Sequence, residues 1–587
     1  MSSYTILIVS PFVFALMVLV PQVTIRNILS IVFVGVLSVV SIFHIMSATS
    51  PIEISLPHLF HTVFIFIDSA LLIYFLWQGV AKKHLLVSIF AVLQMMLYAA
   101  VVYMSPALVS NDILVDKISS VMYLIINIVG GVIIVYALKY IEDEEFTRFK
   151  KNAFIATLFL FLSVMNFIVS TNNIEIFFML FELTTLFSYI LIAYRGDEKS
   201  VENSLRALWM NQVGGVAILL ALILSVVHYD TIYFDQLIAN IDEMYLLPIV
   251  FLVIAAFVKG ASIPFDKWLL GAMVAPTPVS AILHSATMVK IAPYLMLKLF
   301  PAMSGFVSVT ITLFGTFVFF AAALLALSKD YFKEILGLST IAFLALMMAL
   351  AAIGTDEAVM ACLVLIVFHA ISKALLFMQA GILEKTSHLK YVDDINGLIN
   401  HSPLVVFFIV VGFASLTLPP FGAFIGKFMA IESITNEILK TPLYIPALIF
   451  IALGSVFLIL LYFKVLTKLF ATDVDAPKNQ KIKLSKLYTF PSFILLFLLI
   501  EGVYISFDMD LLSSAEIIIP SVLIAVIPFL FVMIMFKKAH RVKEYNCGEK
   551  DEIKLSMYYF DIDDKYKKAI TYISIVSMLI LILGVML

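Results

Sequence analysis

The chain has 587 residues, of which 63% are hydrophobic and 13% are charged, and its mean hydropathy is +1.09. Soluble domains carry about 25% charged residues, so this composition indicates a polytopic membrane protein. The formal net charge of −3 gives no sign of a nucleic-acid partner. The two cysteines, Cys362 and Cys547, are too few for the four thiolates of an iron–sulfur cluster, so we expect no redox centre, cofactor or metal of its own.

Apolar runs long enough to cross about 30 Å of hydrocarbon recur along the chain. The first run lacks the positive start of a secretory signal, and we expect a retained span there. The sequence predicts an all-α fold with about 18 transmembrane helices, at approximately 4 to 20, 27 to 47, 60 to 80, 84 to 104, 116 to 138, 153 to 171, 174 to 194, 206 to 228, 246 to 262, 278 to 300, 304 to 328, 335 to 353, 358 to 383, 403 to 424, 444 to 469, 488 to 507, 517 to 536 and 569 to 587.

The loops between these runs alternate in charge. Lys and Arg gather in odd-numbered loops, at Arg26, Lys82, Lys83, Lys139, Arg148, Lys150, Lys151, Arg195, Lys199 and Arg206, and later at 478–486 and 537–543. Neither residue type occurs in the intervening loops, at 48–59, 105–115, 171–173, 229–245, 354–357 and 508–516. Because Lys and Arg collect on the cytoplasmic side, we expect a multi-pass protein of the cell (inner) membrane with both termini outside.

Several ionisable side chains interrupt the apolar spans. Each costs about 2.5 to 3.5 kcal/mol at the bilayer centre, so each needs an explanation. A single charge could simply hold two helices together, but several in consecutive spans predict a proton path. The members are Glu182 in FFMLFELTTLF, Lys259 in FLVIAAFVKGASIPFDKW, His284 and Lys290 in APTPVSAILHSATMVK, His369 and Lys373 in HAISKALLFMQAG, and Lys427 in LTLPPFGAFIGKFMA.

Two further charges carry less weight. Asp68 in HTVFIFIDSALLIYF lacks a charged partner motif and is interpreted as a helix-packing or interfacial group. Lys333 begins a span on the basic side, where the charge bias of the loops alone explains it.

Helix breakers lie next to two of the intramembrane lysines. Gly260 and Pro264 follow Lys259, while Pro419 and Pro420 precede Lys427. Broken helices at membrane depth are tolerated where protein or water satisfies the freed backbone groups, and a pair of them points to an ion site built on inverted repeats. We therefore expect two discontinuous helices and two inverted five-helix repeats.

The expected domain division follows from these repeats. It comprises N-terminal helices at 1–111, a connecting helix at 112–152, the first repeat at 153–300, the second at 301–470, and C-terminal helices with a short amphipathic connector at 471–587.

Over about residues 112 to 430 the chain resembles the antiporter-like subunits of respiratory complex I, multi-subunit sodium/proton antiporters and membrane-bound energy-converting hydrogenases. The resemblance is carried by VKGASIPFDKWLLGAMVAPTPVSAILHSATMVK, FKEILGLST, HAISKALLF and LPPFGAFIGKF. It implies two five-helix bundles, each with a half-channel, joined by a polar axis at the membrane midplane. The positions that match the family's functional residues are Glu182, Lys259, His284 or Lys290, Lys333, His369, Lys373 and Lys427.

The chain departs from the family pattern at four places. Leu365 stands where a second histidine is common, Gly215 where an aspartate is common, and Gly260 where a serine is typical. The spans at about 60 to 80 and 84 to 104 are additional to the sixteen of the quinone-reductase form.

The segment at 537–568 bears on which complex the chain serves. The quinone-reductase subunit has a long amphipathic helix before its last span, whereas these 32 residues reach about 48 Å at most. This shortness, Lys290 and the CGE sequence around Cys547 favour a hydrogenase-type complex. The chain would then move protons or sodium beside other membrane subunits and a peripheral hydrogenase or dehydrogenase arm. The alternatives are a complex I-type NADH–quinone oxidoreductase, a sodium/proton antiporter without a redox partner, and an inorganic-carbon uptake system.

Overall fold

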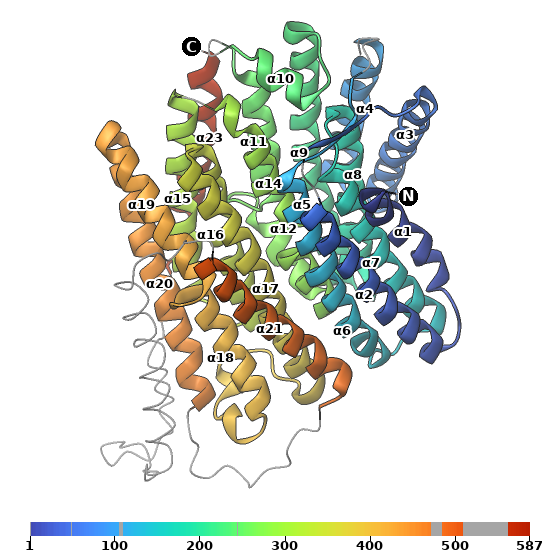
Figure 1. Ribbon diagram of the computed structural model, residues 1–587, viewed down its shortest axis with the longest axis vertical. Helices are drawn as coiled ribbons and strands as arrows, with labels where there is room; N and C mark the ends of the chain where they lie inside the picture. Colours follow the sequence, from blue (N-terminus) through green and yellow to red (C-terminus); the bar gives the residue numbers. More distant parts are fainter. Residues whose placement is uncertain are drawn as a thin grey trace.

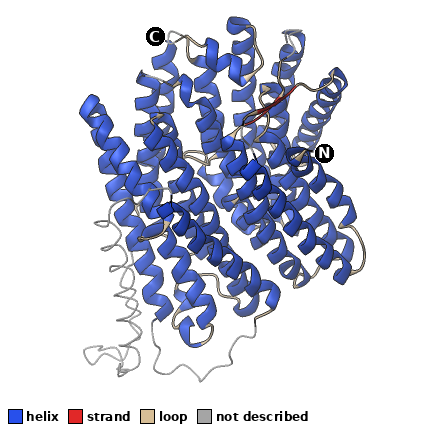
Figure 2. Cartoon of the chain, viewed as in Figure 1, coloured by secondary structure: helices blue, strands red, loops and turns tan. Residues whose placement is uncertain are grey.

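The computed structural model describes residues 2–47, 50–104, 110–242, 245–303, 305–470, 484–508 and 562–586. These residues are almost entirely helical (Figure 2), and 15 of the helical segments among them are long and apolar enough to cross a membrane. The expectation of an all-α polytopic membrane fold is therefore confirmed. The expected span at 517–536, Cys547 and the connector up to residue 561 lie outside the described residues, and α23 (Asp564–Met586) begins within the expected connector.

The helices follow one another along the chain as three groups and two C-terminal helices (Figure 1). The N-terminal group contains α1 (Ser3–Met17), α2 (Val23–Ser47), α3 (His58–Ala81), α4 (Leu85–Met104), α5 (Lys117–Leu124) and α6 (Gly130–Glu142). What we call the first set contains α7 (Arg148–Ile168), α8 (Ile174–Ile192), α9 (Glu198–Tyr229), α10 (Phe234–Asn240), α11 (Leu247–Lys259), α12 (Asp266–Gly271), α13 (Thr277–Ser285) and α14 (Ile291–Leu299). The second set contains α15 (Gly305–Leu327), α16 (Phe332–Ile353), α17 (Asp356–Ser387), α18 (Pro403–Thr417), α19 (Gly422–Lys440) and α20 (Ile445–Phe470), and α21 (Lys486–Asp508) and α23 (Asp564–Met586) follow.

Polar side chains cap several of these helices at their N-termini. Asn173 accepts hydrogen bonds from the first amides of α8, Asp197 caps α9 and Thr355 caps α17. A cap satisfies amides that have no partner within the helix and stabilises it by about 1 kcal/mol. These residues therefore fix where the long apolar helices begin.

Helices α3 and α4 form a hairpin between two short strands, which the sequence did not indicate. Strand β1 (Ile52–Ile54) pairs antiparallel with β2 (Ile113–Val115), with Ile52 opposite Val115. Figure 2 shows this pair as the two strands at one end of the helix bundle. The base of the α3–α4 hairpin, whose two helices are interpreted from the sequence as additional, is thus closed by strand pairing.

The first expected break lies directly after Lys259. Helix α11 ends at Lys259, and Ala261 adopts a left-handed conformation with φ of 52°, which is costly for a residue with a Cβ atom. The Trp268 indole nitrogen donates a 2.9 Å hydrogen bond to the Val258 carbonyl. Protein groups thus satisfy part of the backbone that the break frees, as membrane depth requires.

The second expected break separates α18 from α19. Helix α18 ends at Thr417, α19 begins at Gly422, and Pro419 and Pro420 lie between them. Helix α19 then continues to Lys440, whereas the sequence predicted that this span ends near residue 424. Helix α19 contains no proline, so its backbone hydrogen bonding continues through the polar residues near its C-terminal end.

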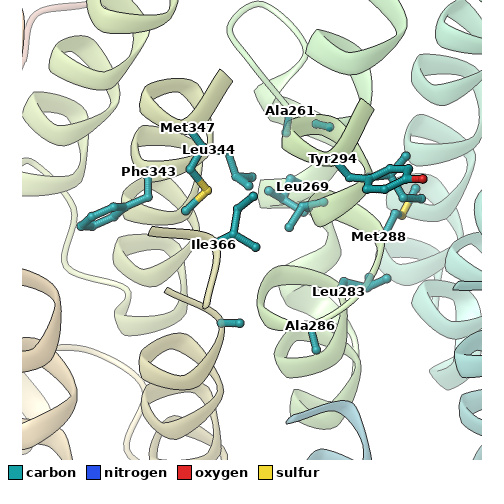
Figure 3. Packing of buried hydrophobic residues seen from close by; sticks show 14 of the residues in the cluster. Ala261, Leu269, Leu283, Ala286, Met288, Tyr294, Phe343, Leu344, Met347 and Ile366 are labelled. Carbon is teal, nitrogen blue, oxygen red and sulfur yellow. The ribbon is translucent and has the colours of Figure 1, made fainter. Parts of the chain in front are cut away.

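The two sets pack tightly against each other through α13, α14, α16 and α17. Figure 3 shows this junction, with Leu344 and Met347 of α16 and Ile366 of α17 near Leu269 and Tyr294 of the first set. All five side chains are at most 1% exposed. Ionisable side chains at this junction therefore lie in a close-packed, water-poor environment.

Candidate functional site

Lys259 and Glu182 belong to one buried site but do not touch. The Lys259 ammonium donates hydrogen bonds to the Thr185 hydroxyl at 3.0 Å and to the Phe181 carbonyl at 3.2 Å. It also lies 3.7 Å from the centroid of the Phe181 ring, within cation–π range. Since Phe181, Glu182 and Thr185 share one turn of α8, the lysine binds beside the carboxyl while the two groups make no ion pair within 4.0 Å.

The Glu182 carboxyl is held instead by Gln94 of the α3–α4 hairpin. The Gln94 side-chain amide donates to Glu182 Oε1 at 2.8 Å and to the Gln212 carbonyl at 3.1 Å. Gly215 makes this contact possible, because a Cβ atom there would overlap both Glu182 Oε1 and Gln94 Nε2. Glu182 Oε2 has no hydrogen-bond partner among the described residues, so one carboxyl oxygen is free to bind a proton.

A lysine–histidine pair joins the two sets. Lys290, just before α14, has its ammonium nitrogen 2.8 Å from Nδ1 of His369 on α17. Both residues are 0% exposed. A protonated lysine can donate to Nδ1, and a neutral lysine can accept from a protonated ring, so one proton can lie on either side of this contact.

His284 and Lys373 lie near this pair. His284 is fully buried, and neither ring nitrogen has a hydrogen-bond partner among the described residues. Lys373 donates to the Leu336 carbonyl at 3.1 Å and to the Ser339 hydroxyl. Lys373 follows His369 by one helical turn, so the two share a face of α17.

Lys427 is separated from the other ionisable groups by an aromatic ring. Its ammonium lies 5.9 Å from the centroid of Phe343, and the same ring packs on His369, at 5.4 Å between ring centroids. Lys427 is 4% exposed. Phe343 thus contacts both the lysine of the broken helix and the lysine–histidine pair.

Lys333 belongs to a different cluster of charges. Its ammonium lies 2.6 Å from Glu384 Oε2, which also accepts a 2.8 Å hydrogen bond from Thr277. Arg195 lies 3.9 Å from the other oxygen of Glu384 and 3.3 Å from Glu144. The structure therefore pairs Lys333 with a carboxylate on the basic side of the protein and does not place it in contact with the other predicted site residues.

A cavity opens on the basic side and approaches His284. Its volume is about 640 Å³, and its lining residues include Lys199, Arg206, Lys267, Leu270 and Met273. A Cβ atom on Gly337 would contact Leu270 and Met273 and lie 3.7 Å from His284 Cε1. Leu270 and Met273, which line the cavity, and the imidazole thus all lie close to Gly337 of α16.

Sequence reasoning missed several partners of the predicted residues. Gln94, Thr185, Phe181, Phe343 and Glu384 all touch a predicted residue. Gln94 gave the clearest available signal, since it is an amide in the apolar run FAVLQMMLYAA. Within the described ranges, no group of three or more His, Cys, Asp or Glu side chains could hold a metal ion.

The chain matches two models of known protein families. Residues 171–461 match the family model described as NADH:quinone oxidoreductase/Mrp antiporter, TM, and residues 103–150 match NADH-Ubiquinone oxidoreductase (complex I), chain 5 N-terminus. The chain is 31% identical over 345 residues to the Na(+)/H(+) antiporter A1 subunit of Staphylococcus haemolyticus (strain JCSC1435). It is also 30% identical over 345 residues to the corresponding A1 subunit of Staphylococcus aureus (strain JH9).

The matched regions cover different shares of each protein. Each of the two alignments covers 55% of this chain but 42% of the relative, so the chain spans less than half the length of these curated relatives. A solved chain of the membrane-bound sulfane sulfur reductase, an archaeal respiratory membrane complex, has the same fold with a TM-score of 0.70 and 19% identity. That match covers 87% of this chain and 96% of the solved chain. The chain therefore belongs to the family of antiporter-like membrane subunits found in complex I-like and multi-subunit sodium/proton antiporter complexes.

Proposed function

We propose that the chain translocates protons, or sodium, as the antiporter-like subunit of a multi-subunit complex in the cell membrane. The observation that carries this proposal is the 2.8 Å contact between Lys290 and His369, which joins ionisable groups of the first set to those of the second. The proposed path comprises Glu182, Lys259, His284, Lys290, His369, Lys373 and Lys427.

The proposed mechanism begins at Glu182 and Lys259. Lys259 binds the turn of α8 that carries Glu182, so a small movement of the carboxyl would bring it to the ammonium or take it away. Such a movement changes how strongly Lys259 holds its proton, because a nearby carboxylate favours the charged lysine. A proton released there would pass to His284 or Lys290 and on through His369 to Lys373 and Lys427.

We also propose that the two sets are inverted repeats with one half-channel each. The breaks after Lys259 and around Pro419 support this reading, since each lies beside an intramembrane lysine. The cavity on the basic side would give the first half-channel its opening toward the cytoplasm, with both termini outside. Lys333 would act at this cytoplasmic opening, where it pairs with Glu384.

The partners are part of the proposal. A redox-driven complex of the energy-converting hydrogenase type is supported by the fold shared with an archaeal respiratory complex and by the short segment at 537–568. It would bring other membrane subunits and a peripheral hydrogenase or dehydrogenase arm. A sodium/proton antiporter without a redox arm is the second candidate, favoured by the antiporter subunits among the relatives.

Purification of the tagged complex from its own host tests both candidates. The complex, with its subunits identified by mass spectrometry, would be reconstituted in liposomes that contain a pH-sensitive dye. Proton movement on addition of a reductant and acceptor supports the redox-driven complex, and proton movement driven by a sodium gradient alone supports the antiporter. A reconstituted complex that moves neither ion under either condition overturns the proposed function.

A further inference from the structure

We propose that the α3–α4 hairpin, together with Glu175 of α8, forms a second row of polar side chains, which brings protons to Glu182 from the membrane side whose loops lack Lys and Arg. We call these side chains the outer row. Asp68 is the carboxyl that accepts a proton from the surface cluster and passes it on toward Glu182. The members of the outer row are His61, Asp68, Gln94, Tyr98 and Glu175. This inference rests on the proposed proton translocation and names a route from that side to Glu182, opposite to the cytoplasmic opening proposed above.

Helical spacing aligns the outer row with Glu182. His61 and Asp68 are seven residues apart on α3, as are Glu175 and Glu182 on α8. Two turns separate the members of each pair, so each pair lies on one helix face at depths that differ by about 10 Å. Both helices begin on the side without Lys and Arg, and α3 packs against α4 and α8.

The outer end of the row reaches the protein surface. His61 is 27% exposed, and its Nε2 lies 3.3 Å from Asp112 Oδ2. Next in the row, the Tyr98 hydroxyl of α4 donates a hydrogen bond to Glu175 Oε1 at 3.3 Å. His61 and Asp112 both act electrostatically on Glu175, so these groups form one cluster at the mouth of the row.

Asp68 links this cluster to Glu182. The sequence suggested a helix-packing or interfacial group, and its side chain is 1% exposed, which agrees with packing between helices. The Tyr98 hydroxyl is the side chain that can hydrogen-bond to Asp68, and the charged groups that act on it are the carboxyls of Glu175 and Glu182. A buried carboxylate with carboxyls and no cation beside it is costly, and the carboxyl avoids this cost by binding a proton.

The last step runs through Gln94 to Glu182. The Gln94 amide donates to Glu182 Oε1, which leaves Glu182 Oε2 and Gln94 Oε1 without hydrogen-bond partners in the described part of the chain. A proton from Asp68 would bind the free oxygen of Glu182. The hairpin therefore holds the carboxyl of the first half-channel and also leads to it.

The spacing of the oxygens favours a proton relay over a sodium site. A metal cation needs several oxygens at about 2.3 to 2.6 Å around one point. The carboxyls of Glu175 and Glu182 are instead separated by two helical turns, and both act electrostatically on Asp68. Groups in single file pass a proton stepwise, whereas they cannot enclose a cation.

Isosteric substitution of Asp68 in the complete reconstituted complex tests the row. Asp68→Asn keeps the shape of the side chain and removes its ability to ionise, and Asp68→Glu restores the carboxyl. The control is Gln78→Leu in the same helix, because buried Gln78 accepts a hydrogen bond from Tyr189 outside the row. Lys259→Ala is the reference for the proposed function itself.

We expect Asp68→Asn to lower the rate of proton translocation about tenfold or more, a change worth about 1.4 kcal/mol in barrier height. Asp68→Glu should recover most of the rate, and Gln78→Leu should keep it. Full activity in Asp68→Asn beside loss in Lys259→Ala overturns the outer row alone. Full activity in both variants overturns the proposed function.

Carbodiimide labelling gives a readout that does not depend on activity. Dicyclohexylcarbodiimide adds to protonated carboxyl groups in apolar surroundings, and mass spectrometry of the digested complex locates the adduct. We expect adducts on Asp68 and Glu182 that decline as the pH rises. Label on Glu182 without label on Asp68, or protection of Asp68 by sodium at constant pH, would contradict a proton-binding carboxyl at Asp68.

Discussion

The ammonium nitrogen of Lys290 and Nδ1 of His369 lie 2.8 Å apart, although 79 positions separate the two residues in the chain. Met347 approaches the same ammonium, with its sulfur at 3.9 Å, and the Phe343 ring packs on the imidazole. Apolar walls of this kind keep water out and strengthen the electrostatic coupling of the two groups. A proton that crosses between the two sets thus has one direct side-chain contact to use.

Substitution of His369 tests this contact. His369→Gln keeps a hydrogen-bonding side chain but cannot bind and release a proton, so we expect translocation by the reconstituted complex to fall about tenfold or more. The control is His44→Gln, because buried His44 hydrogen-bonds Ser3 outside the path. Equal rates in the two variants would show that protons do not pass through His369.

Enlargement of Gly215 tests how the hairpin holds Glu182. In Gly215→Ala the new methyl group overlaps Glu182 Oε1 and Gln94 Nε2, so both side chains must shift. Overpacking of this kind costs about 1 to 3 kcal/mol, and we expect a lower midpoint of thermal unfolding in detergent together with slower translocation. Gly35→Ala is the control, since a Cβ atom there meets nothing within 4 Å. Unfolding midpoints that match in the two variants would contradict the close approach.

The sequence indicated the ionisable residues of the proposed path but not their partners. Glu182 and Lys259 could be found because a charge in an apolar span has a high cost that demands an explanation. Gln94 could not be assigned to Glu182, because a neutral amide carries little such cost and 88 positions separate the two residues. Phe343 gave no signal either, since aromatic residues are frequent in this chain and only the packing shows which ring faces Lys427.

The same limits apply to the fold. Breaks at Gly260 and Pro419 could be predicted because glycine and proline disrupt helical hydrogen bonding locally. The pairing of β1 with β2 could not, since each strand has three residues and the α3–α4 hairpin separates them. Lys333 lies on a family motif, but that match does not show its partner, which is Glu384. Glu384 lies near the end of α17, where a charged residue is common and therefore gives no signal in the sequence.

Lys333 and Glu384 should behave as an energetically coupled pair. Removal of one partner of a buried ion pair leaves an uncompensated charge, so Lys333→Met and Glu384→Gln should each destabilise the protein, by about 3 to 5 kcal/mol at most. The double variant should lose less stability than the sum of the two losses, as followed by thermal unfolding of the purified complex. Strictly additive losses would show that the 2.6 Å contact does not stabilise the protein.

Phe343 should act as an apolar barrier between His369 and Lys427. Phe343→Ala removes the ring that both residues contact, and a constriction without its apolar ring admits water more easily. We expect liposomes with this variant to leak protons faster when no driving force for pumping is supplied. The control is Phe314→Ala, since buried Phe314 packs on Phe257 and touches neither residue. Equal leak rates in the two variants would count against the barrier.

The most direct test of the proposed translocation is the rate of ion movement by the reconstituted complex when Lys259 is replaced by alanine. The matched control is Lys464→Ala, because Lys464 is also buried but pairs with Asp330 at 2.8 Å, away from the path. With assembly verified for both complexes, we predict that Lys259→Ala loses about tenfold or more of its translocation rate while Lys464→Ala keeps most of it. A fully assembled Lys259→Ala complex that translocates ions at the unmodified rate would contradict the central claim.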